Sequence, residues 1–181
     1  EDSLNIKDAI EKVGSPNVVV LGTGFIGMEI AASLQTSGKV NLITVVGIES
    51  LPMSNVFGEE VGRALLKLHQ TNGIKFELGR KISNLVKADS KVVGVLLDSG
   101  IEIPCDVLIV GIGVTPATEY INSSYSDYLN PDGSLTVDKN LSIPGLNKVF
   151  AAGDIARFKA SYARQPVRIE HWNVAIDQGI F

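Results

Sequence analysis

Cysteine is almost absent from this sequence of 181 residues, which contains only Cys105. One cysteine excludes an internal disulfide, a CxxC redox pair and a cysteine-based metal site within this chain. Histidine is also scarce, because the chain has only His69, within a predicted helix, and His171. The sequence offers no nucleophile paired with a base. We therefore expect neither a metal site nor covalent catalysis by the protein itself.

Long apolar runs and a surplus of basic residues are missing as well. Gly, Asn or Lys interrupts each apolar run well before the roughly 20 residues that a membrane-spanning helix needs, so no membrane span is expected. The 16 basic and 20 acidic residues give a net charge of -4, which provides no electrostatic reason to expect nucleic acid or an anionic membrane as a partner. The remaining composition, 45% hydrophobic and 20% charged, is that of an ordinary globular protein.

The two ends of the sequence indicate a fragment. The chain begins at Glu1 without a methionine and stops at Phe181 within a helical pattern. No targeting segment can be identified from such a start. We therefore expect a longer parent protein, with the cytoplasm or the mitochondrion as its location.

Strand and helix patterns alternate in the first part of the chain, which predicts an α/β fold with a mainly parallel sheet. A helix is followed by a βαβα unit. The predicted elements are a helix over residues 3–13, a strand over Asn17–Leu21, a helix from Ile26 to the glycine at 38, a strand over Val40–Val46 and a helix with the apolar stripe Val61, Leu65 and Leu68.

The next part of the chain is richer in strand patterns, which occur in "KFEL", "KISNLVKA", "KVVGVLLDSGIEI" and "DVLIVGIG". Asp98-Ser99-Gly100 is a good hairpin turn. We predict a three-stranded antiparallel patch inserted before a closing strand over Val107–Val110. From Val114, short strands and loops lead to a last helix that starts at Trp172.

The segment "NVVVLGTGFIGMEIAASL" contains the pattern G-x-G-x-x-G from Gly22 to Gly27. Glycine-rich turns are common, but this one directly follows a strand and opens a helix, as a dinucleotide site requires. Gly22 would permit the tight turn, Gly24 would let the backbone approach a pyrophosphate, and Gly27 would let the helix pack closely on the strand. The pyrophosphate would lie at the helix N-terminus, where free N–H groups and the helix dipole favour an anion.

A carboxylate that bonds the ribose 2′-hydroxyl is expected about 20 residues after these glycines, at the end of the second strand. In "LITVVGIES" that position holds Gly47, and Glu49 follows two residues later. Glu49 either substitutes for the missing acid or is a solvated loop carboxylate, and the sequence leaves both alternatives open. No Lys or Arg stands between Thr44 and Val56, whereas a 2′-phosphate needs an arginine nearby. NADH is therefore favoured over NADPH.

Four ordered motifs together resemble a known family. The motifs "VVVLGTGFIGMEIAASL", "VLIVGIGVTPATEY", "VFAAGDIARF" and "RIEHWNVAIDQG" look like those of the pyridine-nucleotide-dependent FAD oxidoreductases. The resemblance covers the chain from about Asn17 and is closest to the ferredoxin reductases and the related apoptosis-inducing-factor-like proteins, including those with an N-terminal Rieske domain. It implies a Rossmann-type NAD-binding domain followed by the C-terminal part of an FAD-binding domain.

The resemblance assigns cofactor contacts to the first two motifs. It implies an NAD site that contains Gly22, Gly24, Phe25, Ile26, Gly27 and Glu29. Glu29 would lie near the nicotinamide, and its alternative is an ordinary acid at the start of a helix. Gly111 and Gly113 would let the backbone approach the cofactor, and their alternative is a simple turn ended by Pro116.

The last two motifs carry the FAD contacts that the resemblance implies, at Gly153, Asp154, Glu170, His171 and Trp172. Asp154 would bond the ribityl chain. The helix from Trp172 would point its N-terminus at the pyrimidine edge of the flavin, where its dipole stabilises negative charge on the reduced ring. Without the family, Asp154 would cap a turn, Trp172 would be a core aromatic and His171 a surface residue.

Two parts of the family pattern are missing from the 181 residues, the earlier G-x-G-x-x-G for the ADP half of FAD and the C-terminal interface domain. We therefore divide the chain into residues 1–14, which end a preceding FAD-domain segment and form a linker helix, residues 15–113, the NAD(P)-binding domain, and residues 114–181, an incomplete C-terminal segment of the FAD domain. Such a fragment is not expected to hold FAD firmly or to be active alone.

The function implied by the resemblance is that of an FAD-dependent oxidoreductase. It would transfer hydride from NAD(P)H to flavin and pass electrons to an iron–sulfur acceptor, a ferredoxin or a Rieske centre. The alternatives are a monodehydroascorbate- or quinone-type reductase and an apoptosis-inducing-factor-like signalling protein with little turnover. The net charge of -4 argues against a DNA-binding version of the signalling alternative.

Overall fold

The structure, a computed structural model, describes residues 2–180. Contacts divide this part of the chain into two compact units, and the division along the chain falls between Gly113 and Val114. We call them unit 1, up to Gly113, and unit 2, from Val114. The assignment of each unit to a cofactor stays a prediction.

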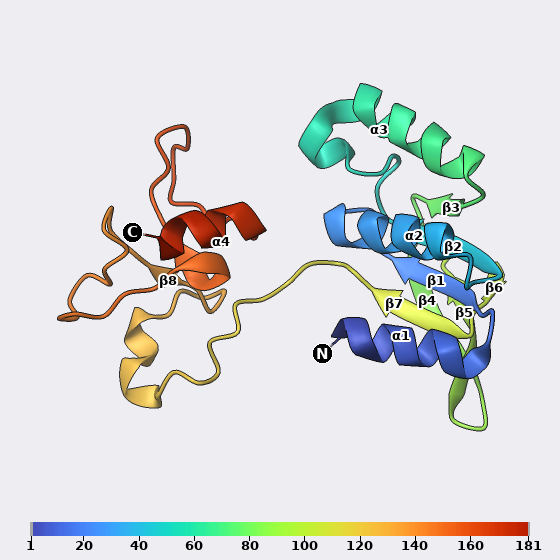
Figure 1. The fold of residues 1–181 in the computed structure, drawn as a ribbon, viewed down its shortest axis with the longest axis horizontal. Coiled ribbons are helices and arrows are strands. Elements are labelled where there is room, and N and C mark those ends of the chain that lie inside the picture. The colour runs from blue at the N-terminus through green and yellow to red at the C-terminus, as the bar shows by residue number, and fades with distance from the viewer. Residues whose placement is uncertain (1, 181) are drawn as a thin grey trace. The chain divides into compact units, whose positions relative to one another are not determined.

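Unit 1 is an α/β fold with a four-stranded parallel sheet, in the strand order β3-β2-β1-β7 (Figure 1). Its elements are α1 (Asp2–Val13), β1 (Asn17–Leu21), α2 (Phe25–Ser37), β2 (Leu42–Gly47), α3 (Ser54–Thr71), β3 (Lys75–Leu78), β4 (Ile82–Ala88), β5 (Lys91–Leu97), β6 (Glu102–Pro104) and β7 (Val107–Val110). The Rossmann-type fold class predicted from the sequence is thereby confirmed, including the antiparallel β4-β5-β6 insertion.

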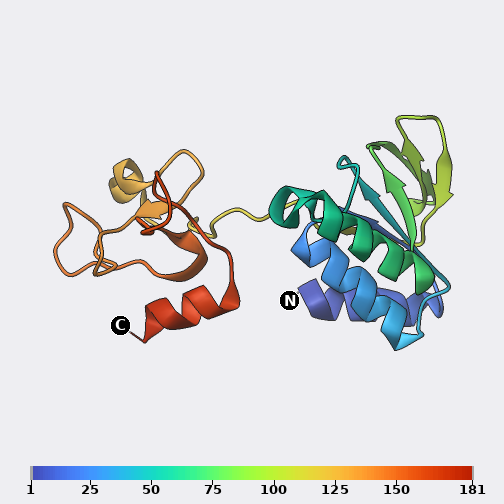
Figure 2. The same ribbon diagram turned by 90° about the horizontal axis from the view of Figure 1, so that it is seen from above.

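Both faces of the parallel sheet are covered, which explains why β1 is an uninterrupted apolar run. Figure 2 shows the three helices on one side of the sheet and the antiparallel strands on the other. Successive β1 side chains alternate accordingly: Val18 and Val20 belong to the core beneath the helices, and Val19 to the core beneath β4-β5-β6. The buried sheet holds the strand ends, and hence the loops that follow them, in fixed positions.

Two predicted elements of unit 1 differ from the structure. The strand expected over Val40–Val46 starts later, at Leu42, because the preceding Asn41 pairs its N–H with the Pro16 carbonyl in the adjoining turn (2.9 Å). The apolar stripe expected on α3 is largely unburied, since Val61 and Leu68 are 43% and 56% exposed. Gly58, with φ +80°, also breaks α3 into two helical pieces.

Unit 2 has little regular structure, as the sequence predicts from Val114 onward. It contains the 3-10 helices η1 (Ser123–Tyr128) and η2 (Gly153–Ile155), the short parallel strands β8 (Leu135–Thr136) and β9 (Ala156–Arg157), and the helix α4 (Trp172–Gly179). A small core holds these pieces together, formed by Leu135, Val137, Ile143, Ala151 and Ala156. Among residues 2–180, no helix is long and apolar enough to cross a membrane.

Candidate nucleotide-binding site

The glycine-rich loop joins β1 to α2 at the carboxyl end of the sheet, and Gly22 makes its sharp turn. Gly22 has φ +119°, a conformation that favours glycine. Its N–H donates to the Val46 carbonyl of β2 (2.8 Å). A side chain at this position would collide with the carbonyl group of Gly111, which follows β7. The turn therefore needs glycine for its backbone conformation and for its packing.

Gly27 is fixed by packing of the helix on this turn. A Cβ atom at Gly27 would collide with the Gly22 carbonyl oxygen. Gly111 closes the cluster from the third side, because a Cβ atom there would lie 3.3 Å from the backbone of Gly27. Glycine at 111 is thus explained by protein packing alone, whereas Gly113 has φ +124° and open space around it.

Gly24 differs from Gly22 and Gly27, because neither its backbone conformation nor packing against protein atoms requires glycine. Its backbone is extended, with φ -81° and ψ -172°, and a Cβ atom built on it meets no atom within 4 Å. It is the N-cap of α2 and provides no side-chain cap, so the first N–H groups of the helix have no side-chain partner there. This is the geometry in which a helix N-terminus receives an anion such as a pyrophosphate.

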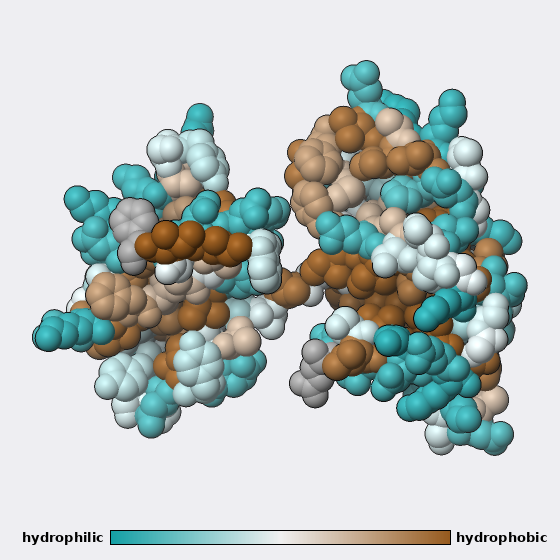
Figure 3. Space-filling model, in the orientation of Figure 1, coloured by the Kyte–Doolittle hydropathy of each residue, from teal (hydrophilic) through white to brown (hydrophobic). Residues whose placement is uncertain are grey.

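Apolar side chains lie next to this helix start. Phe25 and Ile26 are about half exposed, and Phe25 meets Phe57 of α3 edge to face with ring centroids 5.5 Å apart. Figure 3 shows apolar surface over the first turns of α3. Glu29, predicted near the nicotinamide, is exposed on α2 one turn after Phe25. The structure therefore gathers Phe25, Ile26 and Glu29 at one helix end and leaves them accessible.

Glu49 lies against the glycine loop. Thr23, which is 3% exposed, donates its hydroxyl hydrogen bond to Glu49 Oε2 (2.6 Å). The Met53 N–H donates to the Thr23 carbonyl (3.0 Å), so the loop after β2 is attached to the glycine loop at two points. Glu49 is half-buried. Glu49 was expected either to substitute for the missing acid or to be a solvated loop carboxylate. The structure shows that its side chain is not freely solvated.

Arg80 is a cation at the same edge that reasoning from the sequence missed. Its N–H donates to the Gly47 carbonyl (3.0 Å), and the Gly79 N–H donates to the Glu49 carbonyl (3.0 Å). The segment between Thr44 and Val56 contains no cation, but β3 runs parallel to β2 and brings the residues after its end to the end of β2. The sequence prediction considered only the segment between Thr44 and Val56, so it did not take Arg80 into account.

The predicted FAD residues of unit 2 lie at the start of α4, just before it, and in η2, which contacts α4. The Gly153 N–H donates to Gln178 Oε1 of α4 (2.7 Å). His171 is the N-cap of α4, and its Nδ1 accepts a hydrogen bond from the Asn173 N–H (3.2 Å). Trp172 is 77% exposed, so the alternative of a core aromatic is wrong. An exposed aromatic beside a helix N-terminus suits a flat, electron-rich ligand.

Arg168 joins the segment of Asp154 to that of Glu170, and sequence reasoning missed it. Its Nη1 donates to the Asp154 carbonyl (3.2 Å) and forms an ion pair with Glu170 Oε1 (2.7 Å). The Arg168 side chain is only 14% exposed. Its place two residues before Glu170, in "RIE", was the available signal. Asp154 and Glu170 are therefore held close together by one arginine.

An acidic side chain supports this arginine cluster and should make unit 2 sensitive to acid. The hydroxyl and N–H of Ser134 and the guanidinium of Arg157 hold the pKa of Asp132 well below its usual range. A lowered pKa contributes stability that is complete above the unfolded pKa of about 4 and disappears as the pH falls toward the folded value. We expect Asp132→Asn to lower the melting temperature at pH 7.

Thermal unfolding of the unaltered protein and of the Asp132→Asn variant would check this prediction. The measurements should run from about pH 2 to about pH 7, because this range spans the usual carboxyl pKa of about 4. The difference in melting temperature should be largest at neutral pH and should shrink as the acid limb is reached. Asp127→Asn, at an exposed position of η1, is the matched control and should leave the melting temperature unchanged. A constant difference at all pH values would contradict the linkage.

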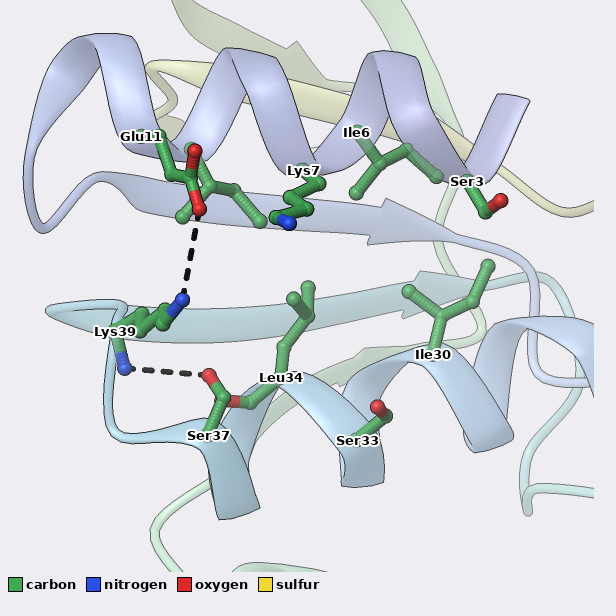
Figure 4. A pocket seen from close by; sticks show the side chains of 10 residues that line it. Ser3, Ile6, Lys7, Glu11, Ile30, Ser33, Leu34, Ser37 and Lys39 are labelled. Atoms are coloured by element: carbon green, nitrogen blue, oxygen red, sulfur yellow. Dashed lines mark hydrogen bonds and ion pairs between the residues drawn. The ribbon is translucent and has the colours of Figure 1, made fainter. Parts of the chain in front are cut away.

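A separate groove lies between α1 and α2, away from the glycine loop. Its volume is about 310 Å³, and Ile6, Ile10, Ile30 and Leu34 line it. Figure 4 shows the ion pair between Lys39 and Glu11 (3.6 Å) at one end of the groove. None of the residues predicted to bind a nucleotide lines this groove.

Burial shifts the pKa of two further side chains in unit 1, Cys105 and His69. Burial raises the pKa of the Cys105 thiol, which keeps it protonated at neutral pH. Burial lowers the pKa of His69, within α3. Among residues 2–180, no three His, Cys, Asp or Glu side chains are grouped to hold a metal ion. The site offers backbone N–H groups, the carboxylates of Glu29 and Glu49 and apolar side chains, which suit binding and orientation of a ligand.

The model of the pyridine nucleotide-disulphide oxidoreductase family matches residues 2–179 of this chain. The chain belongs to this family. Human apoptosis-inducing factor 3 is 39% identical over 166 residues, which are 90% of this chain and 26% of that protein. A ferredoxin–NAD(P)(+) reductase from Sphingomonas is 33% identical over 176 residues, 95% of this chain and 41% of that protein.

The fold agrees with that of a solved family member. The crystal structure of a ferredoxin reductase from Rhodopseudomonas palustris superposes with a TM-score of 0.83 at 28% identity, over 97% of this chain and 42% of that one. The predicted family, in its ferredoxin reductase and apoptosis-inducing-factor-like branch, is thereby confirmed. This chain spans about a quarter to two fifths of the length of these relatives.

Proposed function

We propose that this protein is an NAD(P)H-dependent flavoprotein reductase that uses FAD and delivers electrons to an iron–sulfur protein. The observation that supports this proposal most directly is the open, uncapped helix start at Gly24 in a member of this family. When bound, the nicotinamide supplies a hydride, and the flavin accepts it and releases electrons singly to the acceptor. The residues of this chain would bind these two groups and orient them.

In unit 1, the N–H groups that follow Gly24 would hold the pyrophosphate of NAD(P)H. Phe25 and Ile26 shield the adjoining surface from water, and Glu29 lies on the same exposed side of α2. In unit 2, Asp154 would hold the ribityl chain of FAD. The exposed N-terminus of α4, with His171 and Trp172, would lie at the flavin ring, where the helix dipole favours negative charge.

NADH is the donor that we propose. Glu49 presents a carboxylate beside the glycine loop, and a carboxylate accepts a ribose hydroxyl but repels a 2′-phosphate. For the acceptor, we propose a ferredoxin-type or Rieske centre, since the Sphingomonas and Rhodopseudomonas relatives are ferredoxin reductases by name.

Rapid mixing of the whole flavoprotein with NADH and with NADPH tests the proposal. We expect NADH to bleach the flavin absorbance faster than NADPH, because the carboxylate of Glu49 disfavours the extra phosphate. Subsequent addition of oxidised ferredoxin, an isolated Rieske protein, monodehydroascorbate or a quinone, each in a separate experiment, identifies the acceptor by the rate at which flavin absorbance returns. Absence of bleaching with both donors would overturn the reductase function and favour a signalling role.

A further inference from the structure

Arg168 lies between two carboxylates and contacts both. Its Nη1 is 2.7 Å from Glu170 Oε1, and its Nε is 3.6 Å from Asp132 Oδ2. The guanidinium of Arg157 pairs with the same Asp132 oxygen at 2.7 Å. Two arginines and two carboxylates thus form one continuous row, which ends at Glu170 and in which positive and negative charges balance.

Three groups hold Arg168, which makes it a fixed charge. Its side chain is only 14% exposed, and Nη1 also donates to the Asp154 carbonyl (3.2 Å). An arginine withdrawn from water needs such partners, because they replace its lost hydration. The carboxylate of Glu170 is more accessible, at 36% exposed. Removing the Arg168 guanidinium would therefore leave a negative charge at Glu170 without this ion-pair partner.

Glu170 stands next to the surface at which we propose that the flavin ring lies. It directly precedes His171, the N-cap of α4, and the exposed Trp172 follows. Two-electron reduction gives the flavin ring a negative charge, which the dipole of α4 favours. An unpaired carboxylate at Glu170 would oppose this effect by like-charge repulsion. Its pairing with Arg168 removes that repulsion.

The same arginine connects the two ends of the proposed FAD surface. Asp154, in η2, would hold the ribityl chain, whereas Glu170 lies at the end where the ring would bind. Arg168 Nη1 contacts the backbone of the first residue and the carboxylate of the second. A second attachment of η2 comes from Gln178 of α4, whose Oε1 accepts the Gly153 N–H at 2.7 Å. The ion pair therefore also limits how far the Glu170 carboxylate can move.

We propose that Arg168 is a positioning residue of the flavin site, which neutralises the carboxylate of Glu170 beside the ring and thereby raises the reduction potential of bound FAD. Arg168 acts through Glu170. A higher potential favours hydride transfer from NAD(P)H to the flavin. This inference rests on the proposed function, because it concerns the cofactor that the proposed reductase would hold.

The first test removes the positive charge of Arg168 from the whole flavoprotein. Arg168→Gln should shift the two-electron midpoint potential of FAD to a more negative value. We expect about a tenfold change in the ratio of oxidised to reduced flavin at a fixed potential, the order expected for one charge near a partly exposed site. For a two-electron couple this is about 30 mV. Spectroelectrochemical titration with redox mediators measures the potential without NADH.

A matched control has the same substitution at another arginine of this segment. Arg164 is exposed to water, where solvent and salt screen its charge. Arg164→Gln should therefore leave the potential of the flavin unchanged. An equal shift in the Arg164→Gln and Arg168→Gln proteins would show an effect of overall charge and would contradict a specific role of Arg168.

The second test separates the charge of the pair from a merely structural role. Glu170→Gln alone should shift the potential to a more positive value. The double variant, with Arg168→Gln and Glu170→Gln together, should return close to the potential of the unaltered protein, because the two lost charges cancel and contacting residues are coupled. A double variant that keeps the full negative shift of Arg168→Gln would contradict the proposal.

Two further variants keep the test decisive if Arg168→Gln fails to retain FAD. Arg168→Lys preserves the positive charge but loses the planar fork of the guanidinium, so its potential should stay close to that of the unaltered protein. Glu170→Gln leaves Arg168 in place and should still shift the potential to a more positive value. An unchanged potential in the Glu170→Gln protein would overturn the proposal, whatever the stability of the arginine variants.

The outcomes distinguish this inference from the proposed function. If the unaltered whole protein holds no FAD, or if neither NADH nor NADPH reduces its flavin, the proposed function fails. If NADH reduces the flavin and the potentials of the Arg168→Gln and Glu170→Gln proteins equal that of Arg164→Gln, the reductase function stands and the role of Arg168 is wrong.

Discussion

Replacing Gly24 with valine should weaken NADH binding by about a hundredfold or more, equivalent to roughly 3 kcal/mol. A pyrophosphate at the start of α2 would accept charge-assisted hydrogen bonds from the backbone N–H groups there, and each such bond contributes about 1.5–3 kcal/mol. The side chain of valine would fill the space through which the phosphates approach. That space contains no protein atom within 4 Å of a Cβ atom.

The fold itself should tolerate this change. The backbone of Gly24 has φ -81° and ψ -172°, which a valine can adopt. Valine is a poorer N-cap than glycine, so a loss of about 1 kcal/mol of stability is expected. Calorimetric titration of the whole protein with NADH measures the affinity, and circular dichroism confirms folding. Gly179→Val, at another open glycine with ordinary φ, is the control. Unchanged NADH affinity in the Gly24→Val protein would show that the glycine loop is only a structural turn.

Local patterns were sufficient to predict most of unit 1. The β-branched run at Val18 to Val20 fits a strand buried on both faces, and the glycines directly after it fit the turn into α2, because both signals depend on neighbouring residues only. The antiparallel insertion was predicted for the same reason, from short strand patterns and the Asp98-Ser99-Gly100 turn. The Gly100 N–H indeed donates to the Leu97 carbonyl (3.0 Å).

Contacts between the ends of neighbouring strands could not be predicted from local sequence patterns. Gly47 pairs with Leu78 in the parallel register of β2 and β3, so Arg80 reaches the end of β2 although it is far from Glu49 in the sequence. In the same manner, Leu21 pairs with Val110, and the next residues along the two strands bring Gly22 and Gly111 together. Such contacts follow from strand order and register, which no single segment encodes.

Unit 2 was the least predictable part because it lacks periodic segments. Its organising contacts are long-range polar ones, such as the ion pair of Arg157 with Asp132 (2.7 Å) and the bonds of Arg168 to the segments of Asp154 and Glu170. Loop residues of this kind leave no helical or strand period in the sequence. The family motifs indicated the expected cofactor residues there, but not the role of Arg168, which joins the segments of Asp154 and Glu170.

Replacing Gly27 with alanine should have the opposite signature to the Gly24 substitution, with loss of stability as its primary effect. An alanine inside a helix normally stabilises it by up to about 1 kcal/mol relative to glycine. At Gly27 the methyl group would instead collide with the Gly22 carbonyl oxygen, and the Val20 side chain would lie 3.5 Å from it. Backbone cannot rotate away as a side chain can, so we expect a net cost of about 3 kcal/mol.

A loss of about 3 kcal/mol should lower the melting temperature of the affected unit by roughly 10 °C. Amide hydrogen exchange would show where the Gly27→Ala protein loses stability. We expect faster exchange in peptides from β1 and the first turn of α2. Gly179→Ala should be neutral or slightly stabilising, because a Cβ atom there meets nothing within 4 Å. If Gly27→Ala were as stable as Gly179→Ala, the close approach of α2 to the turn would be wrong. The two substitutions together therefore separate a glycine that a ligand requires from one that the fold requires.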